Sequence, residues 1–475
     1  MCRTRIPIVA ALLFVVPPLA TCYAQSPSEL PAVDQVKKQI ESIRPAIVQF
    51  SYDGFGSGQL HFGCGVIVSS DGHVAVCGPV GAVLDDRLLE LITTDGRKLR
   101  GRALGWSSEY GVGMLKIDEP GQWKFVKLSD KVIAGETCLA LGYPQNRGSE
   151  DDNIPGIRLG LVTTVCKGQW FLTSYQSDFG SHPVFNLHGE LLGLQVSSDG
   201  TYSTFSDMSQ IRNHWQDLAS GLNMDRKRLF EQTKPPVSFA ELPTKMTADA
   251  LERAKAATVK IGEAGKKPYF SGVIVPGGYV LTCAHHGRLP GDQLEITLAD
   301  GRTANAVVKC PNRITDTCLL KISGIGEWPC VELGYSNIVP AGTSVVMIGY
   351  PTNNNGIATV LEASVVDTPR GGLKRRDSFS DTLFLECNDE EAVTNLNGAS
   401  GGGIFDTAGN VIGVMDSTDA SWSHDGVFHG EVWNARVELI HNNWEELTAD
   451  SAVETVDNEE ATRKQSDLAK LASEL

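Results

Sequence analysis

Short apolar, β-branched segments recur along the chain and predict β-strands. Typical examples are GVIV, YVLT, LEITL and VIGVM, each four or five residues long. Gly, Asn and Asp-Gly pairs interrupt the segments, and these residues favour tight turns. A chain of 475 residues is long enough for two or three domains. The pattern therefore indicates an all-β protein made of closed or nearly closed sheets.

The same apolar blocks occur twice in the same order, so the chain contains a tandem repeat. CGVIVSSDGHVAVCGPV at 64–80 matches SGVIVPGGYVLTCAHH at 271–286. Further along, LALGYPQN matches VMIGYPTN, and PVFNLHGELLGLQVSSD matches GIFDTAGNVIGVMDSTD. The offset between the copies drifts only from about 206 to 220, as loop insertions would produce.

The repeat predicts two domains with a connecting segment and a tail. We expect the first domain at 34–222, a linker at 223–246 and the second domain at 247–445. Each domain begins with a short helix that runs into a strand. The tail at 446–475 is acidic, rich in alanine and poor in aromatic residues, which is typical of either a surface helix or a disordered segment.

The first 24 residues have the three regions of a secretory signal peptide. MCRTR is basic, IPIVAALLFVVPPLA is apolar, and TCYAQS offers a cleavage site after Ala24. The apolar run is shorter than the roughly 20 residues of a membrane-spanning helix. We therefore expect an exported protein, periplasmic or secreted, without a transmembrane anchor. LATC, which ends at Cys22, leaves attachment as a lipoprotein as an alternative.

Charge and cysteine spacing narrow the expected partners and ligands. The formal net charge of −16 becomes −18 when cleavage removes Arg3 and Arg5. Such an acidic protein is poorly suited to bind nucleic acid, because phosphates would be repelled. Nine cysteines remain after cleavage, and none forms the CxxC pair of a typical zinc site. The sequence thus predicts no metal and no cofactor, and it leaves oligomerisation open.

The second copy carries three residues suited to nucleophilic catalysis. His285 in YVLTCAHHG follows a strand, Asp316 in RITDTCLLKI precedes one, and Ser400 lies among glycines in NLNGASGGGIF. A serine hydroxyl is a weak nucleophile that needs a neighbouring base, and the base needs a partner that orients it. His286 is the rival candidate for the base, although the alignment of the two copies favours His285.

The second copy resembles a trypsin-fold serine protease, most closely the bacterial HtrA-type branch. The family blocks GSGVI, LTNxHV, DLALLKI, GNSGGPL and GxVIGI stand here in the same order as FSGVIV, LTCAHH, DTCLLKI, GASGGGIF and GNVIGV. The resemblance covers nearly all of 265–445. It implies two tandem trypsin-like domains, each a pair of antiparallel β-barrels, and hydrolysis of peptide bonds in protein or peptide substrates.

The resemblance also implies a role for each residue. His285 would accept the Ser400 proton, Asp316 would orient the imidazole, and Ser400 would attack the scissile carbonyl. The backbone N–H groups of Gly398 and Ser400 would form the oxyanion hole, in which one donor contributes on the order of 3 kcal/mol.

Several residues depart from the family pattern near the expected substrate pocket. Ala399 and Gly403 replace family residues beside the serine, and the acidic segment Glu386–Ser400 is longer than usual. Asp416 falls near the pocket-lining strand. It would either attract a basic substrate side chain or serve as an ordinary hydrogen-bonded carboxylate.

The first copy has lost all three catalytic residue types. Pro79, Gly111 and Gly180 stand at the positions of His285, Asp316 and Ser400. We therefore expect a pseudoprotease domain that regulates the second domain, binds substrate or acts as a scaffold. The leading hypothesis is an exported serine endopeptidase. The alternatives are a binding protein with both domains inactive and a serine esterase that uses the same triad.

Overall fold

The structure is a computed structural model, and part of the chain lies outside the described residues. The signal peptide predicted at 1–24, most of the linker, Pro79 and Gly180 are among the parts not described. The described residues are 30–53, 60–77, 88–107, 109–144, 154–166, 169–175, 179, 181–198, 203–224, 241–286, 288–312, 314–366, 382–387, 389, 393–422, 428–436, 440, 444, 448 and 453–475.

The first barrel of each domain has six antiparallel strands in the same order. In the first domain the order is β1-β2-β3-β6-β5-β4, and in the second it is β13-β14-β15-β18-β17-β16. The first set is β1 (Ile47–Asp53), β2 (Leu60–Ile67), β3 (His73–Cys77), β4 (Leu88–Thr93), β5 (Lys98–Ser107) and β6 (Val112–Ile117). The second set is β13 (Thr258–Gly262), β14 (Phe270–Val275), β15 (Tyr279–Thr282), β16 (Gln293–Thr297), β17 (Thr303–Asn312) and β18 (Thr317–Ile322).

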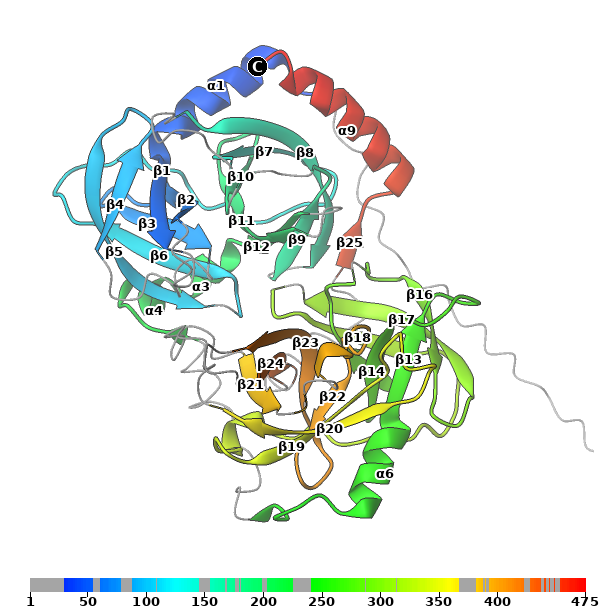
Figure 1. Cartoon of the computed structure of the whole chain (residues 1–475). Coiled ribbons are helices and arrows are strands. Elements are labelled where there is room, and N and C mark those ends of the chain that lie inside the picture. Colours follow the sequence, from blue (N-terminus) through cyan, green and yellow to red (C-terminus); the bar gives the residue numbers. More distant parts are fainter. Residues whose placement is uncertain are drawn as a thin grey trace, which may run out of the picture.

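The second barrels also share one topology, and Figure 1 shows the four barrels grouped into two lobes. The first domain has β7 (Thr137–Gly142), β8 (Gly156–Cys166), β9 (Trp170–Thr173), β10 (Pro183–Asn186), β11 (Leu191–Ser198) and β12 (Ser203–Asp207), closed by pairing of β8 with β9. The second domain has β19 (Ser344–Gly349), β20 (Thr359–Val365), β21 (Thr382–Cys387), β22 (Gly403–Phe405), β23 (Val411–Trp422) and β24 (Phe428–Arg436). This architecture confirms the predicted all-β class with two antiparallel barrels per copy.

The repeat extends to irregularities in strand pairing. A β-bulge adds an unpaired residue to one strand and redirects the side chains around it. The strand pairings shift register at matching places in the two domains, so the two domains have the same bulges. The matched pairs of shifts are Ala103/Trp106 with Val308/Cys310, Val184/Phe185 with Ile404/Phe405, and Gln195/Ser197 with Met415/Ser417.

A short helix leads into each domain. Helix α1 (Val33–Ile43) buries Val36, Ile40 and Ile43 and continues through η1 (Arg44–Ala46) into β1. Helix α6 (Ala248–Ala257) runs into β13, and the side chain of Thr247 caps it by accepting a hydrogen bond from the Ala250 N–H. The remaining named helices before the tail are α3 (Ser209–Asn213), α4 (Trp215–Ala219) and η4 (Ser336–Ile338).

The C-terminal segment returns to the first domain instead of extending from the second (Figure 1). Strand β25 (Val453–Thr455) pairs with the end of β8. Helix α9 (Asn458–Ala472) follows, and its Asp457 cap accepts hydrogen bonds from the N–H groups of Glu459 and Glu460. Leu468 is fully buried in the first domain's core, and Gln465 donates to the Leu159 carbonyl at 3.1 Å. The tail is therefore packed against β8.

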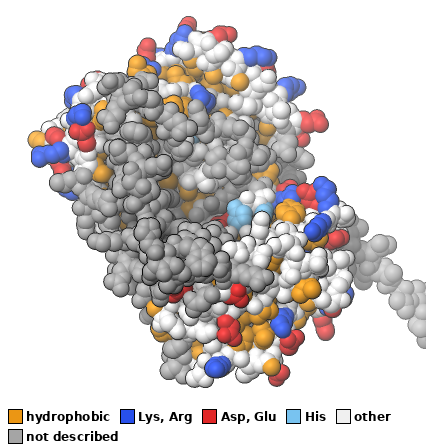
Figure 2. All heavy atoms as spheres, viewed as in Figure 1, with side chains coloured by type: hydrophobic (Ala, Val, Ile, Leu, Met, Phe, Trp, Pro, Cys, Tyr) orange, Lys and Arg blue, Asp and Glu red, His pale blue; other side chains and the backbone are white. Residues whose placement is uncertain are grey.

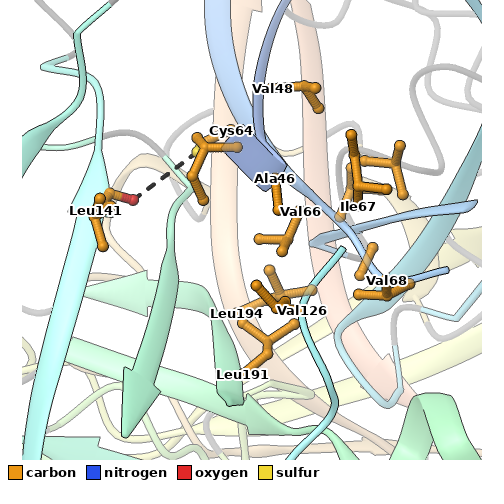
Figure 3. Close-up of a cluster of buried hydrophobic side chains, with 14 of the residues drawn as sticks. Ala46, Val48, Cys64, Val66, Ile67, Val68, Val126, Leu141, Leu191 and Leu194 are labelled. Atoms are coloured by element: carbon orange, nitrogen blue, oxygen red, sulfur yellow. Dashed lines mark hydrogen bonds between the residues drawn. The ribbon is translucent and has the colours of Figure 1, made fainter. Parts of the chain in front are cut away.

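The first domain keeps a continuous hydrophobic core although it lacks the candidate catalytic residues. Val66 from the first barrel and Leu191 and Leu194 from the second belong to one buried cluster, and Figure 3 shows them close together. Cys64 Sγ donates to the Leu141 carbonyl at 3.9 Å across the same region. Burial on this scale explains why the fold persists without the chemistry.

No helix among the described residues is long and apolar enough to cross a bilayer.

Candidate active site

His285 and Asp316 lie in contact, as the sequence predicted. His285 follows β15, and Asp316 precedes β18, the strand that pairs with β15. Asp316 Oδ2 lies 2.7 Å from His285 Nδ1, while Asp316 Oδ1 accepts the backbone N–H groups of His285 at 2.7 Å and Ala284 at 2.9 Å. The carboxylate therefore fixes both the ring and the backbone of the histidine, and it leaves Nε2 on the opposite side of the ring, 3.8 Å from Cys283 Sγ.

The turn that carries Asp316 has a left-handed backbone. Asp316 has φ of 52°, and Gly111 at the matching position of the first domain has φ of 65°. The Asn312 side chain orders the approach to this turn by accepting the N–H groups of Ile314 and Thr315 at 3.0 and 3.2 Å. A non-glycine residue in this conformation carries strain, which is a feature of functional sites.

The Ser400 loop packs against the strand that leads to His285. The Ser400 carbonyl accepts the Ser271 N–H at 2.8 Å. A methyl group added to Gly401 would lie 2.2 Å from both the Ser271 carbonyl oxygen and Thr282 Oγ1. The loop thus approaches β14 and β15 as closely as a glycine permits. Ser400 Oγ and His285, both among the described residues, are not hydrogen-bonded to each other.

The two backbone donors predicted for the oxyanion hole have no acceptor among the described residues. Within the described part of the chain, neither Gly398 N–H nor Ser400 N–H makes a protein hydrogen bond, whereas the Ala399 N–H between them donates to the Leu396 carbonyl at 2.8 Å. Gly398 has φ of 90°, a value that few other residues adopt. A pair of unpaired N–H groups beside a serine is the arrangement that an anionic oxygen requires.

A second carboxylate lies beside the histidine. Asp416 is the bulged residue of β23, and its Oδ1 is 3.7 Å from His285 Nδ1. Burial opposes protonation of His285, but its hydrogen bond to Asp316 and the negative charges of Asp316 and Asp416 outweigh burial, so the pKa of the imidazole is raised. Neither interpretation of Asp416 from the sequence specified this contact with His285.

His286 lies beside His285, 4.5 Å between ring centroids, but takes no part in the contact with Asp316. Its ring packs against Phe270 at 4.3 Å and Tyr269 at 5.5 Å between centroids. Burial, together with the neighbouring His285, lowers the pKa of His286 to about 4. His286 is therefore neutral near pH 7 and does not contact Asp316 through a hydrogen bond. The carboxylate contact favours His285 over His286 as the base.

At the described part of the matching site in the first domain, aliphatic side chains lie against Gly111. Val196 is the bulged residue at the position of Asp416. A methyl group added to Gly111 would lie 2.7 Å from Val196 Cγ2 and 3.4 Å from Cδ1 of Ile314, a residue of the second domain. His182 is fully buried and bonds through Nε2 to the Tyr175 hydroxyl at 3.1 Å, so it is a core histidine. No replacement relay is formed by these described residues.

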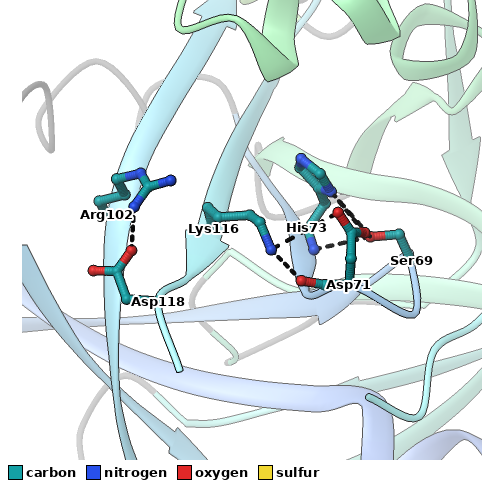
Figure 4. A network of polar contacts seen from close by, with 6 residues as sticks. All are labelled: Ser69, Asp71, His73, Arg102, Lys116 and Asp118. Carbon is teal, nitrogen blue, oxygen red and sulfur yellow. Dashed lines mark hydrogen bonds and ion pairs between the residues drawn. The ribbon is translucent and has the colours of Figure 1, made fainter. Parts of the chain in front are cut away.

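Another Ser, His and Asp group in the first domain lacks triad geometry. Figure 4 shows Ser69, Asp71 and His73 at the turn between β2 and β3. Ser69 Oγ and Asp71 Oδ1 both lie 3.1 Å from the same nitrogen, His73 Nδ1. A relay requires the two partners on opposite ring nitrogens, so this network stabilises the turn.

The face in Figure 2 is hollowed between the two lobes, and histidine side chains lie at this hollow. His285 is exposed over 38% of its side chain. A substrate can therefore reach the imidazole from solvent.

Comparison with known proteins agrees with this geometry. A family model described as a trypsin-like peptidase domain matches residues 63–194 and 270–414, more than half of the chain. The chain belongs to the trypsin-like peptidase family. Both repeats are matched, so the first domain is a member of this family although its candidate catalytic positions have changed.

Curated relatives place the trypsin-like chain near the HtrA type. It is 33% identical over 151 residues to serine protease HTRA4 of Homo sapiens, covering 31% of this chain and 30% of the relative. It is 30% identical over 159 residues to serine endoprotease DegS of Escherichia coli strain K12, covering 33% of this chain and 41% of the relative. It is 35% identical over 150 residues to a probable periplasmic serine endoprotease DegP-like of Rickettsia conorii, covering 31% and 28%. The chain spans about a third of the length of the curated relatives it matches.

Two features of the site were not predicted from the trypsin-like motifs. Asp416 contacts His285 from the bulge in β23, where it is the residue left out of the strand pairing. The sequence signal was the position of Asp416 in GVMD, next to the block that identifies the strand. Cys283 Sγ lies 3.8 Å from His285 Nε2, and only its position two residues before His285 could have suggested this contact.

Replacing Asp416 with Asn should move the acidic limb of the pH profile of kcat/KM to lower pH. The substitution removes one of the negative charges that raise the pKa of His285, while Asp316 remains in place and Cys283 and His286 are unchanged. The imidazole then loses its proton at lower pH and is competent as a base there. Asp300→Asn is the control, because it changes the net charge by the same amount at an exposed ion pair with Arg302. It should leave the acidic limb of the pH profile at the wild-type pH. A profile of Asp416→Asn that coincides with wild type would contradict this prediction.

Replacing Gly401 with Ala should destabilise the protein and abolish labelling of Ser400 by a fluorophosphonate. The added methyl group meets both backbone and side-chain oxygens, and φ of 82° disfavours alanine. Gly291→Ala is a matched control, because Gly291 has φ of 91° but no atom within 4 Å of an added methyl group. We expect the control to lose about 1–2 kcal/mol of unfolding free energy, the usual cost of a left-handed residue, and Gly401→Ala to lose more. Denaturant titration measures both.

Proposed function

We propose that this protein is an exported serine endopeptidase whose second domain hydrolyses peptide bonds through His285, Asp316 and Ser400. The observation that carries the proposal is the 2.7 Å contact between Asp316 and His285 Nδ1, next to a serine loop with two unpaired N–H groups. The serine protease and endoprotease names of the relatives support the same reaction class. The signal-peptide pattern and the periplasmic DegP-like relative support export.

The proposed reaction begins with proton transfer. Nε2 of neutral His285 accepts the Ser400 hydroxyl proton as Oγ bonds to the scissile carbonyl carbon. The Asp316 carboxylate holds Nδ1–H and stabilises the imidazolium that forms. His285 then donates the proton to the leaving amine, and an acyl-enzyme remains on Ser400. A water molecule, activated in turn by His285, releases the acid and restores the serine.

The N–H groups of Gly398 and Ser400 would bind the oxyanion formed in each half of the reaction. Each donor in a preorganised site contributes about 3 kcal/mol to the transition state. The missing hydrogen bond between Ser400 and His285 is compatible with this scheme, because catalytic hydrogen bonds are often long before substrate binds.

We propose that the first domain is non-catalytic and supports the second. Ile314, two residues before Asp316 in the second domain, packs beside Gly111 of the first domain. Cys166, Trp170 and Leu172 of the first domain share a buried cluster with the second domain's first barrel. The Ile314 contact lies two residues from Asp316, and both sets of contacts support a scaffolding or regulatory role for the first domain.

The alternative function is a protein-binding pseudoprotease with both domains inactive. The observation that favours it is the missing hydrogen bond between Ser400 Oγ and His285. The two functions differ in whether Ser400 is activated, and covalent labelling distinguishes them.

Fluorophosphonate labelling should detect an activated serine in wild-type protein and should vanish in Ser400→Ala. Asp316→Asn should fold normally, because Asn tolerates a left-handed backbone, and should lower kcat/KM for a peptide by about 10⁴-fold. Thermal unfolding serves as the control for folding. Folded wild-type protein that neither labels nor cleaves peptides would refute the endopeptidase and favour the binding function. Turnover of esters without peptides would indicate an esterase.

Replacing Ile314 with Asp should lower peptidase activity although residue 314 is not a member of the triad. A carboxylate at this partly buried contact would be desolvated or would separate the domains, and the Asp316 turn would lose its support. Ile325→Asp is the matched control, because Ile325 is fully exposed in the same domain. We expect the control to retain wild-type kcat/KM. Equal activity of the two variants would show that the domain contact does not support catalysis.

A further inference from the structure

Three potential metal ligands gather on the Nε2 side of His285. One ligand atom from each of Cys283, His285 and His286 lies within 4.8 Å of the other two. Cys283 Sγ and His285 Nε2 are 3.8 Å apart. Cys283 is a buried free thiol, whereas His285 faces solvent, so the group has a closed side and an open side.

The spacing suits a tetrahedral ion. Zinc binds sulfur at about 2.3 Å and imidazole nitrogen at about 2.0–2.1 Å, which places two such ligands about 3.6 Å apart. The observed 3.8 Å between Cys283 Sγ and His285 Nε2 needs little adjustment. A thiolate with two imidazoles is a soft to borderline donor set that favours Zn²⁺ and related ions over Ca²⁺ or Mg²⁺.

Asp316 already occupies the supporting position of such a site. Metal-binding histidines usually donate their second ring N–H to a carboxylate, which fixes the tautomer and the ring orientation. The 2.7 Å contact from Asp316 to His285 Nδ1 provides this arrangement and directs the Nε2 lone pair toward Cys283. The same contact therefore prepares His285 for either a proton or a metal ion.

His286 offers a second nitrogen with no competing partner. Its Nε2 is buried and has no hydrogen-bond partner among the described residues. The rings of Tyr269 and Phe270 hold the imidazole beside His285, whose centroid is 4.5 Å away. A buried nitrogen without a hydrogen bond is costly, and one nitrogen of the same ring lies within 4.8 Å of the other two ligand atoms.

We propose that Cys283, His285 and His286 form an inhibitory site for a thiophilic divalent cation such as Zn²⁺, with water in the fourth position. The Cys283 thiol releases its proton to solvent as the sulfur–metal bond forms. The bound ion takes the Nε2 lone pair of His285, which then cannot accept the Ser400 proton. The inhibitory part rests on the proposed peptidase function, and the binding part does not.

A second group of potential ligands, His285, Asp316 and Asp416, is the weaker choice. Its ligand atoms also lie within 4.8 Å of one another, but it uses the Nδ1 side of the ring. An ion there would replace the hydrogen bond between His285 and Asp316. The Cys283 site leaves this bond in place.

The search for CxxC pairs does not detect this group, because it has one cysteine, Cys283, which stands two residues before His285 and three before His286. The sequence analysis predicted no metal, and the proposed site departs from that prediction. The three ligands lie on one short segment after β15, and the turn between them brings their donor atoms to one side.

Direct binding of Co²⁺ and Zn²⁺ to the full chain tests the site without any peptidase assay. Calorimetry should show one tight ion, and Co²⁺ should give the charge-transfer absorption of a cobalt–thiolate bond. Cys283→Ser should lose this band, and both Cys283→Ser and His286→Asn should bind at least about tenfold more weakly, the lower end of the loss for a missing supporting group. Cys330→Ser, at an exposed cysteine outside the group, should match wild type. Unchanged affinity in Cys283→Ser, or no thiolate band in wild type, would overturn the proposal.

Measuring peptide cleavage with and without Zn²⁺ distinguishes the metal-site proposal from the peptidase proposal. Zn²⁺ should inhibit wild-type peptide cleavage and fluorophosphonate labelling, and a chelator should reverse both effects. Each variant is compared with its own metal-free activity, and the inhibition constant should rise at least about tenfold in His286→Asn. Binding with a thiolate band in a protein that never cleaves peptides would support the metal site and refute the peptidase. Active protein that Zn²⁺ binds without inhibiting would overturn the inhibitory part.

Discussion

The carboxylate of Asp316 connects the fold to the candidate chemistry. Its two oxygens contact His285 Nδ1 and two backbone N–H groups, and they tie the end of β15 to the start of β18. The backbone beneath it is left-handed, which costs about 1–2 kcal/mol for a residue with a side chain. The first domain makes the same turn with Gly111 at no such cost. Both domains thus make the turn, and the aspartate of the second adds contacts to the His285 ring and to the backbone of Ala284 and His285.

The repeated blocks predicted the barrels because each block is a strand whose apolar residues must be buried. The order of His285, Asp316 and Ser400 could be assigned because each lies at the end of a block. The position of Asp416 could not, because a one-residue bulge decides the direction of its side chain. The contact of Ile314 with Gly111 joins loops of different domains, and no local pattern encodes such a pairing. The linker and the signal peptide stay predictions.

The two copies show what catalysis would require beyond the shared architecture. Their strand orders and bulges coincide, yet Val196 stands where the second domain has Asp416. At this bulge the first domain has an aliphatic side chain where the second has a carboxylate. A polar cavity costs stability unless its groups are paired, so a domain without chemistry has no physical reason to retain one.

The pairing of β25 with β8 has a consequence for the order of folding. The edge of β8 belongs to the first domain, but the strand that covers it follows the entire second domain in the chain. A chain that folds from its N-terminus as it emerges leaves this edge, and the surface beneath α9, open to water and to other chains until the second domain has emerged. The first domain therefore begins to fold before the second, but its fold is not complete until β25 and α9 have been added.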